Sequence, residues 1–70
     1  MGKLVNIIVN GFGEKAPAGS TVAQLVKLFG ENHPDLICEL NGRYIHRKDY
    51  ASTVAPPGAR LEFIHAAFGG

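Results

Sequence analysis

The hydrophobic and polar pattern at the start of the chain predicts a strand that enters a hairpin. Residues 4–9 (Leu-Val-Asn-Ile-Ile-Val) form a short run rich in β-branched residues. The turn composition Asn10-Gly11-Phe12-Gly13 follows, in which glycine supplies positive φ values. The partner strand is expected in the brief run Glu14-Lys15-Ala16, because Pro17 cannot donate to a sheet ladder and suits the end of an edge strand.

A helical period begins at Thr21 and is expected to run to about Phe29. Thr21 and Gln24 have the spacing of a capping box. Apolar residues then recur at helical spacing, at Val22, Leu25, Val26 and Phe29. Gly30 is placed to end the helix and Pro34 prevents its continuation. We expect these apolar side chains to pack against Val5, Ile7, Leu61 and Phe63.

A second hairpin is predicted in the middle of the chain. The run Ile37-Cys38-Glu39-Leu40 precedes Asn41-Gly42, and Arg43-Tyr44-Ile45-His46 follows it. Asn-Gly between two such runs is the strongest short-range hairpin signal, because both turn positions need positive φ. Residues 47–54 are polar and irregular, with room for one short helical turn.

The order of these elements predicts an α+β fold. Pro56-Pro57-Gly58 turns the chain into a last strand at residues 60–65. Strand pairs around one helix are typical of the β-grasp (ubiquitin-like) fold, a mixed four- to five-stranded sheet packed on one helix, with the first and last strands parallel and central. A ferredoxin-like fold would need a second helix, for which the sequence has no pattern. We expect a β-grasp domain at residues 1–66 and a flexible tail at residues 67–70 that ends Gly-Gly.

Composition limits the other possibilities. A chain of 70 residues has room for one core, and 46% hydrophobic residues are enough to fold it without a metal or disulfide. The single cysteine, Cys38, has no bridging partner, which favours the cytoplasm. A net charge of +1 gives no field for nucleic acid, and no apolar run approaches the roughly 20 residues that cross a bilayer. We expect a cytoplasmic monomer that binds neither nucleic acid nor membrane.

Several motifs, taken in order, resemble one family. They are Pro17–Val22 before the helix, Glu39–Tyr50 around the second hairpin, Pro57–Glu62, and the Gly69-Gly70 end. Together they resemble the ThiS (thiamin thiazole) branch of the ThiS/MoaD ubiquitin-like sulfur carriers. The tail departs from that branch at the bulky Phe68, and Pro56-Pro57-Gly58 replaces a more acidic turn.

The resemblance implies a carrier protein and not an enzyme. A ThiF-like adenylating enzyme would consume ATP to activate the carboxylate of Gly70, and a sulfur donor such as a cysteine desulfurase or sulfurtransferase would convert it to a thiocarboxylate. Thiazole synthase would then use that sulfur for the thiazole of thiamin. The carrier itself would be a co-substrate with no bound cofactor.

Residue chemistry agrees with a role for the Gly-Gly end. An ionised carboxylate is a poor electrophile, and adenylation converts it into a good one. Glycines at Gly69 and Gly70 let the chain enter a narrow cleft. Four alternatives remain open: a frayed end without a role, a carrier for molybdopterin, tungstopterin or an amino-acid pathway, a ubiquitin-like protein modifier, and a plain interaction module.

Strand alternation suggests where a partner binds. If Val5, Ile7 and Val9 face the helix, Ile8 faces away from it, and Ile64 does so on the last strand. Ile8 and Ile64 are then expected to join in one apolar patch leading toward the tail. The candidate partner-binding residues are Ile8, Ile64 and Phe68.

Three other groups of residues are weaker candidates. Cys38 lies within a strand pattern and is expected to be an inert core residue. The histidines show no ligand spacing, so no metal site is predicted at His33, His46 and His65. A basic rim around the second hairpin is as well explained by ordinary surface as by docking; its residues are Arg43, His46, Arg47, Lys48 and Arg60.

Overall fold

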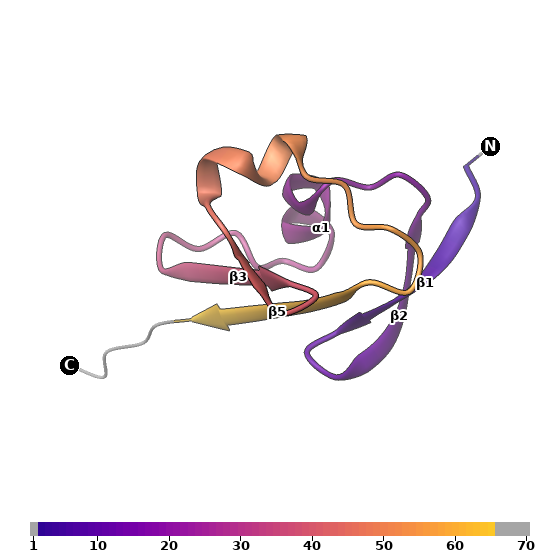
Figure 1. Ribbon diagram of the computed structural model, residues 1–70, viewed down its shortest axis with the longest axis horizontal. Helices are drawn as coiled ribbons and strands as arrows, with labels where there is room; N and C mark the ends of the chain where they lie inside the picture. The colour runs from indigo at the N-terminus through magenta and orange to yellow at the C-terminus, as the bar shows by residue number, and fades with distance from the viewer. Residues whose placement is uncertain (1, 66–70) are drawn as a thin grey trace.

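The computed structural model describes residues 2–65, in which five strands and one α-helix form a two-layer structure (Figure 1). In chain order the elements are β1 (Leu4–Val9), β2 (Phe12–Pro17), α1 (Val22–Leu28), β3 (Leu36–Leu40), β4 (Arg43–Ile45), the 3-10 helix η1 (Arg47–Ser52) and β5 (Arg60–His65). The predicted boundary at residues 66 and 67 and the predicted flexibility of the tail lie outside the described residues.

The sheet has the order β2-β1-β5-β3-β4. The first and last strands, β1 and β5, pair in parallel, and the other neighbours are antiparallel. Both lie inside the sheet, with β5 at its centre (Figure 1). This confirms the predicted β-grasp arrangement.

Helix α1 packs on one face of the sheet and begins at the predicted capping box. Thr21 Oγ1 accepts a hydrogen bond from the backbone of Gln24 at 3.2 Å, and Gln24 Oε1 accepts one from the backbone of Thr21 at 2.9 Å. The buried core includes Val22, Leu25, Val26, Ile7, Leu61 and Phe63, with Val5 and Phe29 half-buried against it. The predicted helix–sheet contact is therefore confirmed.

Both Asn-Gly pairs form two-residue hairpin turns. Asn10 and Gly11 have φ values of 50° and 85°, and Asn41 and Gly42 have 52° and 82°. These are the positive φ values that the turn twist demands.

The partner of β1 is longer than the sequence predicted. It starts at Phe12 and not at Glu14, and all six of its residues pair with β1. The prediction was wrong because it relied on side chains, whereas an edge strand such as β2 can be held by its backbone ladder alone.

Two smaller differences concern the second hairpin. Strand β4 ends at Ile45, one residue before the predicted end, and the short helical turn expected after it is η1. Within residues 2–65, no helix has the length and apolar character needed to cross a membrane.

Candidate functional site

The candidate site is the carboxyl end of β5, the described segment that leads toward Gly69-Gly70. Leu61 and Phe63 anchor this strand in the core. Ile64 points to the opposite, open face of the sheet and is 42% exposed. Gly69, Gly70 and Phe68 lie outside the described residues, so their predicted roles stay predictions.

The asparagine of the first hairpin turn holds β5 in place. Asn10 donates its backbone N–H to the carbonyl of Leu61 at 2.9 Å, and its Oδ1 accepts from the N–H of Phe63 at 2.7 Å. This side chain therefore continues the parallel pairing past the last residue of β1. Asn41 repeats the arrangement at the other end of β5, where its Oδ1 accepts from the N–H of Arg60 at 2.9 Å.

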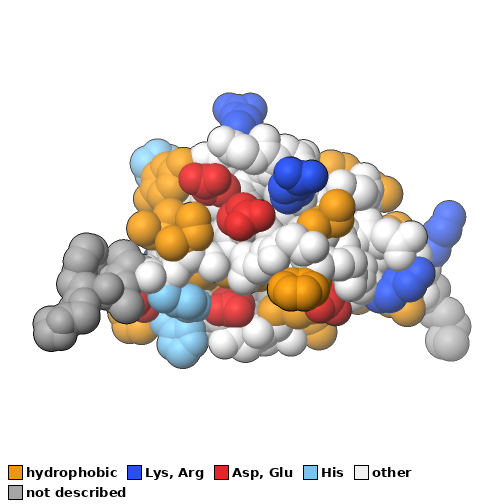
Figure 2. Space-filling view, turned by 90° about the horizontal axis from the view of Figure 1, so that it is seen from below, with side chains coloured by type: hydrophobic (Ala, Val, Ile, Leu, Met, Phe, Trp, Pro, Cys, Tyr) orange, Lys and Arg blue, Asp and Glu red, His pale blue; other side chains and the backbone are white. Residues whose placement is uncertain are grey.

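An apolar patch lies on the open face of the sheet where β5 ends. Ile64 stands directly opposite Ile37 of β3, and Tyr44 of β4 pairs with the residue two positions further along β3. The Tyr44 side chain is 57% exposed and its ring lies 4.8 Å from that of His46. We call Ile37, Tyr44 and Ile64 the end patch. Figure 2, which views the molecule from below, shows hydrophobic side chains gathered toward this end.

The expectation that Ile8 and Ile64 join in one patch is wrong. The parallel register places Ile8 opposite Arg60, four residues before Ile64 on β5. At a rise of about 3.3 Å per residue, that separates the two isoleucines by roughly 13 Å along the sheet. Ile8 instead lines a separate shallow hollow of about 450 Å³ with Asn41, Gly42, Gly58 and Arg60.

Two carboxylates lie side by side on the open face, between the level of Ile8 and that of Ile64 along β5. Glu39 of β3 and Glu62 of β5 are cross-strand partners, and both are half-buried. Figure 2 shows acidic side chains together in the middle of this face. Like charges directly opposite each other destabilise a sheet. Within residues 2–65 neither carboxylate has a cation at ion-pair distance.

Cys38 has the inert position that the sequence predicted. Its side chain is fully buried in the core. Burial, followed by the charge of Glu39, raises the pKa of the thiol to about 11. A protonated and covered thiol is a poor nucleophile.

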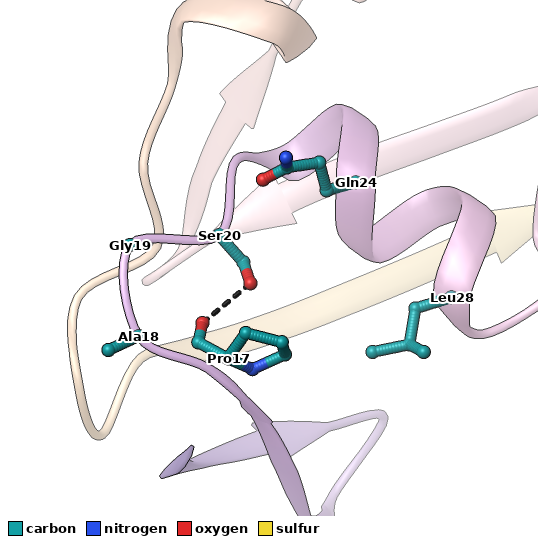
Figure 3. A pocket seen from close by; sticks show the side chains of 6 residues that line it. All are labelled: Pro17, Ala18, Gly19, Ser20, Gln24 and Leu28. Atoms are coloured by element: carbon teal, nitrogen blue, oxygen red, sulfur yellow. Dashed lines mark hydrogen bonds between the residues drawn. The ribbon is translucent and has the colours of Figure 1, made fainter. Parts of the chain in front are cut away.

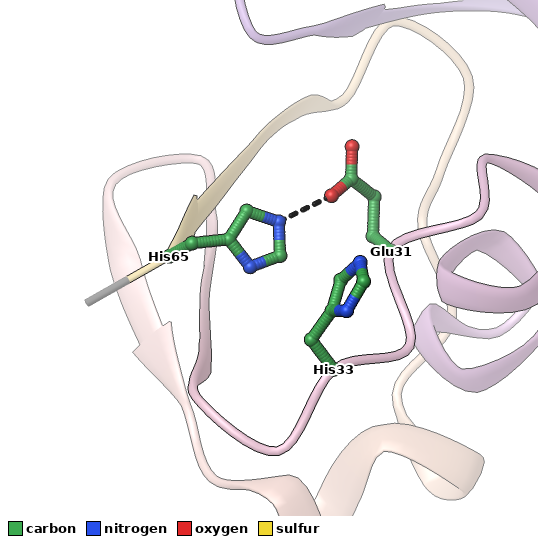
Figure 4. A group of neighbouring side chains, drawn as sticks. All are labelled: Glu31, His33 and His65. Atoms are coloured by element: carbon green, nitrogen blue, oxygen red, sulfur yellow. Dashed lines mark hydrogen bonds and ion pairs between the residues drawn. The ribbon is translucent and has the colours of Figure 1, made fainter. Parts of the chain in front are cut away.

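The fold brings together two histidines that are distant in sequence. The rings of His33 and His65 lie 4.8 Å apart, edge to face, and His65 Nε2 is 2.5 Å from Glu31 Oε1 (Figure 4). The hydrogen bond with Glu31 raises the pKa of His65 above its ordinary value. His46 lies elsewhere, beside Tyr44. No metal site was predicted here because the two histidines are far apart in sequence, and only the fold brings them together.

The predicted basic rim is divided in the structure. Arg47 donates to the carbonyl oxygens of His33 and Pro34 and lies 5.6 Å from the centre of the Tyr50 ring. It thus supports the loop after α1, while Lys48 pairs with Asp49 at 3.4 Å.

A hollow of about 340 Å³ lies beside α1 (Figure 3). Its lining side chains carry no charge, and its hydroxyl group, Ser20 Oγ, donates to the carbonyl of Pro17 at 2.6 Å. Apart from this hydroxyl, which is bonded to the backbone, the lining residues offer no nucleophile and no acid–base group, so we do not treat the hollow as a candidate catalytic site.

The geometry defines a ubiquitin-like β-grasp protein with an apolar end patch and an acidic pair on the open face of its sheet, beside its last strand. The ThiS family model matches residues 2–70, so the chain belongs to the ThiS family. A similar solved structure is the crystal structure of the thiamine biosynthesis protein ThiS from Geobacter metallireducens, with a TM-score of 0.83 and 25% identity. The match covers 94% of this chain and all of that one. No curated protein matches the sequence.

Family membership confirms the resemblance seen in the sequence. ThiS family proteins are small sulfur carriers that act with partner enzymes in thiamine biosynthesis.

Proposed function

We propose that this chain delivers sulfur for the thiazole of thiamin as a thiocarboxylate on Gly70. The observation that carries the proposal is the extent of the family match, which continues through β5 to Gly69-Gly70. The domain supplies a rigid strand before the tail, and the chemistry takes place on the carboxylate that follows it.

The reaction has two steps on the same carboxyl group. An oxygen of the Gly70 carboxylate attacks the α-phosphate of ATP, and pyrophosphate leaves. Hydrosulfide then adds to the acyl carbon of the adenylate, and AMP leaves with the electron pair of the broken C–O bond. A persulfide donor forms an acyl disulfide first, which a thiol reduces to the thiocarboxylate.

The carrier needs three partners for this cycle. A ThiF-like enzyme binds ATP and adenylates Gly70, a cysteine desulfurase or sulfurtransferase supplies sulfur, and thiazole synthase accepts it. The carrier acts in the cytoplasm as a co-substrate and not as an enzyme.

The open face supplies the docking surface for the activating enzyme. Ile64 in the end patch is nearest in sequence to the tail, and the Glu39–Glu62 pair beside it favours a partner with basic side chains. Ile8 contributes from its separate hollow and Phe68 from the tail.

Intact mass spectrometry tests the proposal. The chain is incubated with ATP, a ThiF-like enzyme and a sulfur donor. Exchange of carboxylate oxygen for sulfur raises its mass by about 16 Da. An unchanged mass would contradict the carrier function, and a ladder of conjugates on other proteins would identify a protein modifier instead.

Deletion of Gly70 separates the fold from the chemistry. The variant is expected to keep the circular dichroism spectrum and melting temperature of the full chain, because the deletion changes none of the residues that form the described core. It loses adenylation and thiocarboxylate formation, since the reacting group moves by about 3.5 Å along an extended chain. Full sulfur acceptance by this variant would place the chemistry elsewhere.

A further inference from the structure

Three potential metal ligands meet on the surface at the end of β5. Glu31 and His33 come from the loop after α1, and His65 is the last residue of β5. One ligand atom from each lies within 4.8 Å of the other two. Figure 4 shows the three side chains turned toward one another from two separate segments.

The end of α1 fixes the backbone of Glu31. Gly30 has a φ of 69°, its N–H donates to the carbonyl of Lys27 at 3.2 Å, and the N–H of Glu31 donates to that of Val26 at 2.9 Å. This pair of hydrogen bonds is a Schellman motif, which terminates a helix in a defined geometry.

His33 is positioned by the same loop. Its N–H donates to the carbonyl of Glu31 at 2.9 Å, and its own carbonyl accepts from Leu36 at 3.1 Å and from the Arg47 guanidinium at 2.8 Å. The two ligands on the loop are therefore held by backbone contacts, with the His33 side chain exposed and the half-buried Glu31 side chain bonded to His65.

His65 is oriented from both sides of its ring. Its Nε2 faces Glu31, and its Nδ1 faces Asp35 Oδ1 at 3.7 Å. A carboxylate on the second nitrogen is the usual partner of a metal-bound histidine, because it fixes the tautomer and the ring direction.

We infer that Glu31, His33 and His65 form a zinc site. Two imidazole nitrogens and one carboxylate oxygen are a ligand set that Zn²⁺ takes, with water or a donor from another molecule in the fourth position. Zinc bonds of about 2.0–2.2 Å place ligand atoms roughly 3.4 Å apart at tetrahedral angles. The present ligand atoms lie within 4.8 Å of one another, and His65 Nε2 lies 2.5 Å from Glu31 Oε1, so the site requires shifts on the order of 1 Å in these spacings.

Charge also favours a cation here. Two carboxylates, Glu31 and Asp35, flank the histidines. Bound zinc balances both charges and joins the loop after α1 to the end of β5, the point from which the chain continues toward Gly70. The buried Cys38 does not compete for the ion, because its sulfur lies inside the core.

Zinc titration of the untagged protein tests the site. Calorimetry and competition with a chromogenic zinc chelator are expected to give one Zn²⁺ per chain. His33→Gln, His65→Gln and Glu31→Gln each weaken binding at least about tenfold. His46→Gln is the matched control, since it removes an exposed histidine outside the cluster, and it leaves the affinity unchanged.

Nitrogen chemical shifts of the imidazoles give a second readout on the wild-type chain. Zinc moves the resonances of His33 and His65 and leaves those of His46 in place. The zinc site is excluded if wild-type affinity equals that of a folded His33→Gln, His65→Gln double variant, or if His46→Gln weakens binding equally. These measurements need no activating enzyme, so their outcome is independent of the chemistry proposed for Gly70.

Discussion

At the residue scale, asparagines at the two hairpin turns have a second role besides their positive φ. The sequence predicted both turns, because Asn-Gly is a local signal. It did not predict that Asn10 Oδ1 binds the backbone of Phe63, which is 53 residues away. Such a contact depends on the parallel pairing of β1 with β5, and no local pattern encodes it.

Replacement of Asn10 isolates this contact. Asn10→Gly keeps a residue that tolerates positive φ but removes the hydrogen bond to Phe63, and we expect a loss of about 1 kcal/mol in the free energy of unfolding. Asn10→Ala also adds left-handed backbone strain of about 1–2 kcal/mol. Urea denaturation measures both. Asn32→Gly, at an exposed loop position, is the control for the conformational entropy that glycine adds to the unfolded chain. An equal loss of unfolding free energy in this control would show that the Asn10–Phe63 hydrogen bond does not stabilise the fold.

The buried thiol gives a prediction on pH. Because the folded pKa of Cys38 is about 11 and its ordinary value is 9.0, the unfolded chain loses the proton first. The contribution of the buried thiol to the free energy of unfolding is therefore complete below pH 9.0, and it falls as the pH rises toward about 11. Denaturation at several alkaline pH values should show a steeper loss in the wild type than in Cys38→Ala. Tyr50 is present in both proteins, and burial raises its pKa as well, so the comparison cancels its effect. Parallel pH profiles of the two proteins would contradict the role assigned to the Cys38 thiol.

At the scale of elements, local signals predicted most of the structure. The capping box located the start of α1, and Gly30 located its end. The bounds of β2 were missed because Phe12-Gly13 looked like turn residues, although their backbones pair with Val9 and Ile8. Edge strands contribute backbone hydrogen bonds with little burial, which leaves a weak pattern in the sequence.

The capping box of α1 is a measurable part of the fold. Thr21→Ala removes the acceptor for the N–H of Gln24, and we expect a loss of about 1 kcal/mol in the free energy of unfolding. Thr21→Ser keeps the hydroxyl group and should retain most of the stability. Urea midpoints compare the two variants. Equal losses in both would show that the methyl group, and not the cap, stabilises this helix end.

At the scale of the whole molecule, strand order was predictable and register was not. Connection rules placed β1 beside β5, but no turn joins these strands, so nothing local determines which residues face each other. For this reason Ile8 and Ile64 were wrongly expected to touch. The meeting of His33 with His65 was missed for the same reason, because it depends on where the loop after α1 crosses the end of β5.

The open face leads to a prediction about the activating enzyme. If the end patch is the docking surface, Ile64→Asp introduces a charge beside Ile37 and the Glu39–Glu62 pair, and it weakens binding by about 1–3 kcal/mol. The melting temperature should change little, because Ile64 is 42% exposed.

Leu4→Asp provides the matched control for this test. Leu4 lies on the same face of the sheet as Ile8, four residues earlier on β1, and is 60% exposed. It stands far from the end of β5, so its replacement should leave the affinity unchanged. Calorimetry with a ThiF-like enzyme measures all the variants. If Ile64→Asp binds as tightly as the wild type while Ile8→Asp does not, the docking surface is the hollow around Ile8 and Arg60, and the enzyme approaches from the opposite end of β5.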